Sequence, residues 1–284
     1  MAKRKSLVPG ALGLVVAGFV ALAGVGAPAA PPAPPPVLPT YADLADPADS
    51  APVVLRARVR KVAAVEAARA GGIAPGRGRF YIEAQTEALY FGTTTMGEKL
   101  RYLVDLPLDA RGKPPRLGKQ SVILFARSVA GRPGELQLIT PDSQVFWHPA
   151  TEAQLRGIIT EFNAPGAPAK VSTVREAIHV PGTLAGQGET QLFLATPGGE
   201  PASITVRREP GQTAQISVSF SEVVESAAGL PPANSLAWYR LACFLPGVLP
   251  PRSNLSEGEQ ARAIAERDYR VLMDRLGACP RTRR

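Results

Sequence analysis

Hydrophobic and polar residues alternate with a period of two through the first half of the chain, which is the pattern of strands that bury one face. The segments that alternate, or that form a short apolar run, are residues 53–62, 80–90, 100–106, 121–126 and 136–139, with 144–147 as an extension. Five strands within about 95 residues are typical of a small closed barrel or a sandwich. We therefore predict a compact β domain over residues 51–148.

A helical pattern follows the predicted strands. Thr151 and Gln154 have the spacing of a capping box, in which two side chains satisfy free amides in the first turn of a helix. The expected helix has an apolar stripe at three- and four-residue intervals, formed by Leu155, Ile158, Ile159 and Phe162. Residues 163–170 are rich in Ala, Pro and Gly. We therefore assign residues 149–170 to a helix and a linker between two domains.

The last part of the chain combines short strands with helices. Three strand segments joined by turns with Pro-Gly pairs predict a meander, at residues 191–196, 203–208 and 214–220. A short helix is expected at 235–245. A final helix is predicted to begin at Ser256, where Glu259 would complete a second capping box, and to end at Gly277.

The complete pattern predicts a mainly β protein, α+β overall, with a small barrel followed by a three-stranded meander packed with helices. The segments before the barrel are a signal peptide or N-terminal anchor at 1–30 and a proline-rich linker at 31–50. Residues 171–284 form the predicted C-terminal domain, which contains the meander and the last helices.

The N-terminus has the features of an export signal. Lys3, Arg4 and Lys5 precede a segment without charged residues, 7–30, and a basic start followed by an apolar run is typical of a secretory signal. Residues 7–27 are also long enough to span a bilayer, so an uncleaved membrane tether is the alternative. Both interpretations place the rest of the chain outside the cytoplasm, in the periplasm or the extracellular space.

Two cysteines, Cys243 and Cys279, are the complete set for the chain. In an oxidising compartment they have one possible pairing. Their spacing is unlike the C-x-x-C of redox centres, so we predict a structural disulfide that joins the last two helices.

The net charge of +8 does not indicate a nucleic-acid-binding protein. Six of the basic residues lie at the two ends of the chain, and the body between them is nearly neutral. An exported, near-neutral domain has little of the electrostatic attraction on which nucleic-acid binding depends. We therefore expect no nucleic-acid partner.

The sequence shows no recognisable catalytic or metal-binding motif. His148 and His179 are the two histidines, and neither belongs to a metal-ligand pattern. The Gly-x-Ser-x-Gly nucleophile elbow and the Lys-Ser/Thr ending of a phosphate loop are also missing. We predict no metal and no cofactor. An enzyme would require His179 to lie near a carboxylate such as Glu176, Glu189 or Asp142.

Two groups of arginines are candidate binding residues. Arg56, Arg58 and Arg60 follow one face of the first strand, and the alternative to ligand binding is pairing with Glu83 and Glu87 across the sheet. A second group, Arg77 and Arg79, is expected to lie on the glycine-rich loop 71–78, at the barrel mouth.

Four aromatic residues could line a sugar site or belong to the core: Phe146, Trp147, Trp238 and Tyr239. The core is the more common location for aromatic side chains, which bury a large apolar area. We therefore predict no site from them.

The first domain resembles the netrin-like module, a family that includes tissue inhibitors of metalloproteases. The resemblance is carried by the opening strand 54–62, by the segment Gly118-Lys119-Gln120-Ser121-Val122-Ile123-Leu124-Phe125, and by the closing segment 134–138. It implies an OB-like five-stranded barrel. The family's usual cysteines are missing here. Protease inhibition would require an exposed, rigid segment near 51–54 beside the loop 93–97.

These observations favour an exported, non-catalytic envelope protein that binds an envelope protein or glycan through barrel loops and sheet edges. Two alternatives remain open: a cell-envelope hydrolase with an unidentified carboxylate/histidine site, and a protease-inhibitor-like module.

Overall fold

The computed structural model describes residues 1–2, 38–66, 68, 70–92, 96–221 and 228–282. The chain divides into two compact units, Met1–Val37 and Leu38–Arg284, and everything below concerns the second. The predicted signal peptide or anchor lies outside the described residues, apart from its first two. Within the described ranges, no helix has both the length and the hydropathy needed to cross a bilayer.

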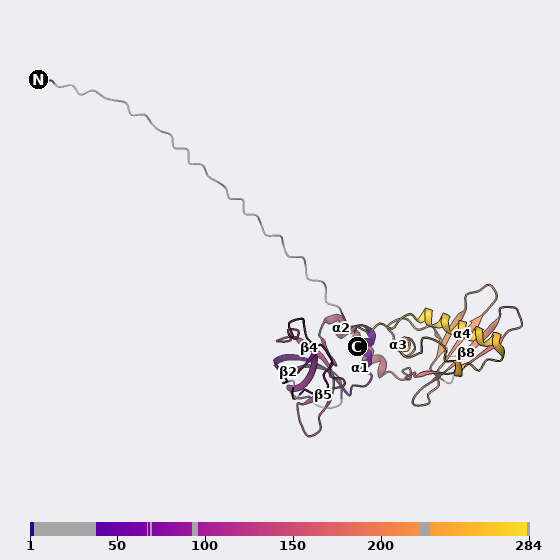
Figure 1. The fold of residues 1–284 in the computed structure, drawn as a ribbon, viewed down its shortest axis with the longest axis horizontal. Coiled ribbons are helices and arrows are strands. Elements are labelled where there is room, and N and C mark those ends of the chain that lie inside the picture. Colours follow the sequence, from indigo (N-terminus) through magenta and orange to yellow (C-terminus); the bar gives the residue numbers. More distant parts are fainter. Residues whose placement is uncertain (3–37, 67, 69, 93–95, 222–227, 283–284) are drawn as a thin grey trace. The chain divides into compact units, whose positions relative to one another are not determined.

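The first sheet contains the strands that the alternating pattern predicts. Six antiparallel strands have the order β3-β2-β1-β4-β5, with β6 also paired to β4. Figure 1 labels β2, β4 and β5 of this sheet. Their bounds are β1 Val53–Ala64, β2 Arg77–Phe91, β3 Lys99–Pro107, β4 Ser121–Ser128, β5 Leu136–Leu138 and β6 Gln144–Phe146. The sheet does not close through a continuous ladder, so the closed barrel is not confirmed. The edge strand β3 meets the segment before β5 in an isolated parallel bridge between Arg101 and Glu135.

Period-two burial gives the first sheet its own apolar core. Leu55, Ala57 and Val59 on β1 pack with Ile82 on β2 and Leu124 on β4. The β1–β2 ladder has three register shifts, which are the irregularities that bend a strand and increase its twist. A bent β1 allows the sheet to curl around this core, which brings its two edges near each other.

The second sheet is larger than the predicted meander. Five antiparallel strands have the order β11-β10-β9-β8-β7, and the predicted meander is confirmed as β8, β9 and β10. The bounds are β7 Thr173–Pro181, β8 Gly188–Ala195, β9 Ser203–Arg208, β10 Gln215–Ser219 and β11 Ala228–Gly229. The sequence pattern did not reveal β7 because a register shift between Val174 and Glu176 interrupts its alternation, and because a histidine occupies a buried position.

The helices pack between and beside the sheets in one continuous core. They are α1 Tyr41–Ala48, α2 Pro149–Phe162, α3 Leu236–Ala242, the 3-10 turn η3 Pro251–Ser253 and α4 Gly258–Leu276. A single buried cluster includes Leu44 of α1, Phe125 of β4, Leu155 of α2, Leu192 of β8 and Leu272 of α4. The predicted segments 51–148 and 171–284 therefore share one core within the unit.

Helix α1 lies inside the predicted proline-rich linker 31–50 and was not predicted. Thr40 and Asp43 form a capping box at its start. Tyr41 and Leu44 are buried, so the helix belongs to the core. Pro47 lies within its last turn, so residues 41–48 of the predicted linker are helical.

The predicted capping boxes of two helices do not form. Helix α2 begins at Pro149, and the His148 side chain, rather than Thr151, caps it by accepting the Ala150 N–H at 3.2 Å. Helix α4 begins at Gly258 without a side-chain cap. The Ser256 hydroxyl instead accepts the His179 N–H at 3.0 Å. In α2 the preceding histidine takes the place of the predicted capping box. In α4 the serine of the predicted box bonds to a strand instead of to its own helix.

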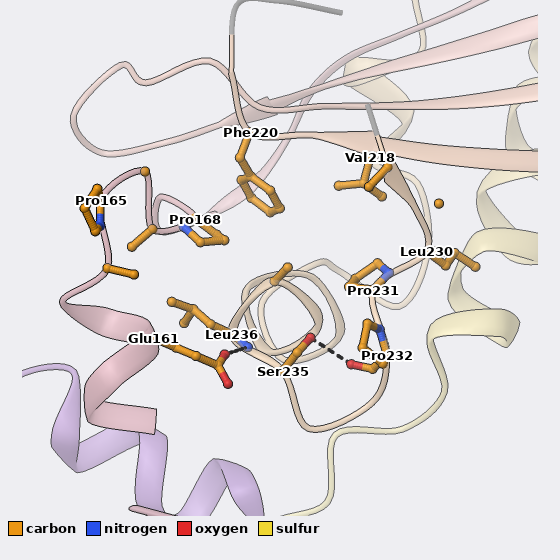
Figure 2. A pocket seen from close by; sticks show the side chains of 16 residues that line it. Glu161, Pro165, Pro168, Val218, Phe220, Leu230, Pro231, Pro232, Ser235 and Leu236 are labelled. Atoms are coloured by element: carbon orange, nitrogen blue, oxygen red, sulfur yellow. Dashed lines mark hydrogen bonds between the residues drawn. The ribbon is translucent and has the colours of Figure 1, made fainter. Parts of the chain in front are cut away.

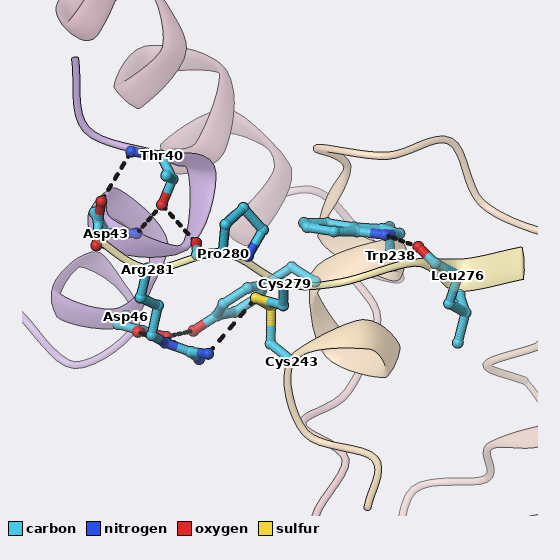
Figure 3. The surroundings of a disulfide bond; sticks show 10 residues. Thr40, Asp43, Asp46, Trp238, Cys243, Leu276, Cys279, Pro280 and Arg281 are labelled. Atoms are coloured by element: carbon cyan, nitrogen blue, oxygen red, sulfur yellow. Dashed lines mark hydrogen bonds and ion pairs between the residues drawn. A yellow bond between two sulfur atoms is a disulfide. The ribbon is translucent and has the colours of Figure 1, made fainter. Parts of the chain in front are cut away.

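The predicted disulfide between Cys243 and Cys279 is confirmed, with a Cα–Cα distance of 5.2 Å (Figure 3). Cys243 caps α3, and Cys279 follows the Gly277 that ends α4 as predicted. The chain after the disulfide docks on α1. The Thr40 hydroxyl donates to the Pro280 carbonyl at 2.8 Å, and Arg281 pairs with Asp46 at 2.7 Å.

Candidate binding site

The outer face of β2 and β3 carries a row of polar and aromatic side chains in register. The cross-strand pairs are Arg79 with Asp105, Tyr81 with Leu103, Glu83 with Arg101, and Gln85 with Lys99. The intervening residues point to the core, which the burial of Ile82, Leu100 and Tyr102 demonstrates. Alternation along paired strands therefore places all eight side chains on one face.

Two cavities lie side by side on this face. The first, of about 560 Å³, lies between β3 and β5, and its walls include Tyr81, Arg101, Leu103, Arg132 and Gln137. The second, of about 600 Å³, contains Arg60, Gln85, Glu98 and Lys99. Tyr81 and Arg101 line both cavities, so the two form one continuous surface. We call the two linings taken together, that is, every residue that lines either cavity, the β2–β3 surface.

The loop between β4 and β5 forms the wall of the surface opposite β3. Its position depends on Gly134, whose carbonyl accepts the Arg101 N–H at 2.8 Å. Gly134 has a φ of 78°, and a Cβ there would lie 2.7 Å from the Lys99 carbonyl oxygen. A side chain would therefore clash with backbone as well as strain the φ angle. Glycine allows the loop to approach β3 closely.

Charge pairing on the surface is incomplete. Arg79 holds Asp105 through two bonds of 2.7 and 2.8 Å, and this pairing raises the pKa of Arg79. Arg101 and Arg132 share one carboxylate, Glu135, at 3.7 and 3.4 Å. Among the described residues no carboxylate lies within ion-pair distance of Lys99. The two linings together carry five cations and four carboxylates, so the surface is weakly positive, with a net charge of +1.

The predicted arginines are divided between this surface and other locations. Arg60 and Arg79 line the two cavities. Arg56 and Arg58 pair with Glu87 at 3.2 and 2.7 Å, so the predicted cross-strand pairing is confirmed for these two.

The predicted partner Glu83 does not contact the arginine row. Glu83 pairs with Lys61 at 3.3 Å. Arg60 instead donates to the neutral amide oxygen of Gln85. The prediction that Arg77 and Arg79 lie on the glycine-rich loop is corrected, because both belong to β2, where Arg79 donates to the Gly71 carbonyl of the loop at 3.2 Å. Arg77 pairs with Asp142 at 3.3 Å.

Arg56 of β1 forms a structural contact with Glu152 of α2. The Glu152 carboxylate accepts hydrogen bonds from Trp147 Nε1, Arg56 and Arg156 at 2.5, 2.8 and 2.9 Å. These bonds, with Trp147 the strongest, lower the pKa of Glu152 to about 2. The guanidinium of Arg56 also lies 5.0 Å from the Trp147 ring centre, so one face of that ring is occupied.

The other candidate aromatic residues do not form a site with Trp147. Trp238 and Tyr239 are buried in the core, where they contact Tyr41 of α1. Phe146 alone of the four is exposed. The prediction that these aromatic side chains belong to the core is confirmed for Trp238 and Tyr239.

His179 belongs to a buried network that holds α4 to the second sheet. Its Nδ1 lies 2.9 Å from the Thr190 hydroxyl, which donates to Asp268 at 2.5 Å, so Nδ1 carries the proton and donates to Thr190. Arg208 donates to the other oxygen of Asp268. Burial lowers the pKa of His179.

The convergence of catalytic groups that an enzyme requires does not occur at either histidine. His179 contacts Thr190 rather than Glu176, Glu189 or Asp142, and its ring is nearly inaccessible. His148 caps a helix. Over the part of the chain that the structure describes, no group of three His, Cys, Asp or Glu side chains is placed to bind a metal.

The segment that an inhibitor would expose is buried. Ala51, Val53 and Val54 are all less than 5% exposed, and Pro52 is the exposed residue among them. Residues 93–95 of the predicted neighbouring loop lie outside the described residues. This segment therefore does not present a free edge to a protease.

An apolar cavity of about 490 Å³ lies between the end of α2, the 163–170 linker and the edge of the second sheet (Figure 2). Phe220, Pro165, Pro168 and Leu236 project into it. Glu161 is the charged residue in its wall, and its carboxylate already accepts the Leu236 N–H at 2.5 Å.

No family model matches the chain, and no curated protein matches it. Tyr81, Lys99, Arg101 and Arg132 were not predicted as site residues. The alternation of β2 and β3 predicts that the first three point outward, but their common surface depends on strand register and on the β4–β5 loop.

Proposed function

We propose that this protein is an exported, non-catalytic binding protein that holds an envelope protein or glycan on the β2–β3 surface. The observation that carries the proposal is the pair of adjoining cavities that share Tyr81 and Arg101. An aromatic ring between hydrogen-bonding and cationic side chains provides both contact area and orientation for a polar ligand.

The strand arrangement supports an OB-like interpretation of the first sheet. Its order, β3-β2-β1-β4-β5, and the parallel bridge at Arg101 are features of a partly open five-stranded barrel. Such folds bind ligands on the face of strands 2 and 3 and on the loop between strands 4 and 5. The β2–β3 surface occupies the same elements. The netrin-like relationship remains a prediction.

Export is proposed from two features. The basic and apolar start of the chain is typical of a signal peptide or membrane tether. The disulfide between Cys243 and Cys279 suits an oxidising compartment such as the periplasm or the extracellular space.

The experiment compares binding of purified envelope polysaccharides and solubilised envelope proteins by the wild type and two variants. Tyr81→Ala and Arg101→Ala together should weaken binding at least tenfold, because they remove the shared ring and the shared cation. The matched control is Arg207→Ala. Arg207 resembles Arg101 in exposure and in having one carboxylate partner, Glu189 at 3.1 Å, but it lies on the second sheet. Equal losses in both variants, or none in either, would contradict the proposal.

A further inference from the structure

We infer that the disulfide between Cys243 and Cys279 is a reducible clasp, in which a dithiol reductant attacks Cys243 and displaces Cys279 as a thiolate beside Arg281. The inference goes beyond the proposed function and does not depend on binding at the β2–β3 surface. Three observations carry it: the two sulfurs have different surroundings, neither cysteine is fully buried, and the segment after Cys279 is anchored to α1.

Cys279 has a cation beside its sulfur. The Arg281 Nη1 donates to Cys279 Sγ at 3.6 Å (Figure 3). The other two guanidinium nitrogens, Nε and Nη2, bond to Asp46 at 2.7 and 3.2 Å, and this pairing fixes the direction of Nη1. A permanently charged guanidinium stabilises a thiolate more than a thiol. Cys279 is therefore suited to be the leaving group, because a more stable thiolate leaves faster.

Cys243 has the opposite surroundings. It is the C-cap of α3, and its N–H faces the carbonyls of Tyr239 and Leu241. The carbonyl groups at the C-terminal end of a helix carry partial negative charge, which disfavours a thiolate there. Attack on Cys279 would require Cys243 to leave as that thiolate. The two ends of the bond are therefore unequal, and attack at Cys243 is the favoured direction.

An attacking thiol can approach the disulfide in the folded protein. Both cysteines are partly exposed, whereas Trp238 on the same helix is 4% exposed. Phe244, the residue after Cys243, is 37% exposed, so α3 ends at the surface. Access of this kind distinguishes a labile disulfide from one that is reduced only after unfolding.

The exchange proceeds in two steps. A thiolate of the reductant attacks Cys243 Sγ, an intermolecular S–S bond forms, the Cys243–Cys279 bond breaks, and the electron pair of that bond goes to Cys279 Sγ. The second thiol of the reductant loses its proton and attacks the reductant sulfur of the mixed disulfide, which releases Cys243 as a thiolate that takes up a proton. Two electrons pass to the two cysteines, and the reductant leaves as its own disulfide.

Reduction releases the segment that follows α4. We call residues 278–282 the strap. The strap bonds to α1 through Thr40 with Pro280 at 2.8 Å and through Asp43 with Thr282 at 2.6 Å. While the disulfide is intact, it holds the strap covalently to α3. After reduction, the strap contacts described here are hydrogen bonds and one partly exposed ion pair, which break far more readily than a covalent bond. We therefore expect α1 and the strap to open together.

The first test locates the mixed disulfide and needs no variant of this protein. The oxidised protein is mixed with a thioredoxin-type reductant whose second cysteine is replaced by serine, so that the reaction stops at the mixed disulfide. Complexes quenched in acid are mapped by mass spectrometry. At least fivefold more adduct should form on Cys243 than on Cys279, because the better leaving group departs.

Arg281→Gln should lower this ratio and slow reduction by dithiothreitol about threefold to tenfold, since it removes the charge beside the leaving sulfur. Arg281→Lys keeps the charge and should restore most of the rate. The matched control is Arg77→Gln, because Arg77 is similarly exposed and also pairs with a carboxylate, that of Asp142. It should reduce at the wild-type rate.

The second test compares amide hydrogen exchange in the oxidised and reduced whole protein. After reduction, the amides of α1 and the strap should exchange within a time over which those of β3 remain protected. Four results would overturn the inference: an adduct equally or mainly on Cys279, an unchanged reduction rate in Arg281→Gln, a disulfide that resists both reductants until urea unfolds the protein, or simultaneous exchange of α1 and β3.

Discussion

Replacing both cysteines by serine should remove most of the stability that the cross-link gives to the C-terminal part of the chain. The disulfide closes a loop across 36 positions. In the chain-entropy model this closure destabilises the unfolded state by about 4 kcal/mol at 25 °C. We therefore expect Cys243→Ser/Cys279→Ser to lower the free energy of unfolding by about that amount.

The fluorescence of Trp238, which is close to the disulfide, should report this loss of stability (Figure 3). The ring is 4% exposed, and its Nε1 donates to the Leu276 carbonyl at 2.8 Å. Urea unfolding followed by tryptophan fluorescence gives the free energy by linear extrapolation. The reduced wild type should match the variant, and reductant should not change the variant.

An oxidised wild type, verified by mass, that differs from the variant by less than about 1 kcal/mol would refute the reasoning. It would mean that the unfolded chain is already restrained by other contacts. Asp46→Asn is a useful companion, because it breaks the ion pair with Arg281 but leaves the cross-link. Its effect should be about 1 kcal/mol, since the pair is about one-third exposed.

Three further predictions concern pH and buried charge. Burial lowers the pKa of His179 in the folded state, so the unfolded chain takes up the proton at a higher pH than the folded chain does. The free energy of unfolding should therefore fall as pH decreases below about 6.5. His179→Gln should flatten that part of the stability–pH curve. The pKa of Glu152 in the folded state is about 2, below its ordinary value of 4.5, so its contribution to the free energy of unfolding is present above pH 4.5 and is lost as pH falls toward 2. In urea unfolding, Glu152→Gln should therefore lower the free energy of unfolding by about 1–2 kcal/mol at pH 7 and by much less at pH 2. Asp268 is fully buried, and Asp268→Ala should cost about 3–5 kcal/mol by calorimetry, because it leaves Arg208 without its ion-pair partner; a loss below 1 kcal/mol would contradict the network.

The sequence predicted elements whose patterns are local. The strand β1 was predictable because Leu55, Ala57 and Val59 alternate with arginines over six residues. The strand β7 was not, because its register shift changes which residues face the core. Capping boxes at Thr151 and Ser256 failed for a similar reason. A neighbouring histidine caps α2, and the Ser256 hydroxyl bonds to a distant strand instead of its own helix.

The binding surface shows the same division between local and distant information. Alternation alone indicates that Tyr81 and Arg101 point outward. It does not indicate that Gly134 brings a loop against β3, since that contact joins segments about 35 residues apart. Arg56 and Arg58 were candidate binding residues because they belong to a basic row. Arg56 is neutralised by Glu87 of the next strand and by Glu152 of a later helix.

The attachment of the last residues to α1 has a consequence for the time at which this unit can fold. Thr40 bonds to Pro280, a partner 240 positions away, and Thr282 bonds to Asp43. During synthesis from the N-terminus, α1 emerges first but obtains these partners last. An isolated helix of eight residues is marginal in water. Helix α1 therefore cannot complete its contacts until residues 280–282 have been made, so this unit reaches its native structure only after nearly all of the described residues have been synthesised.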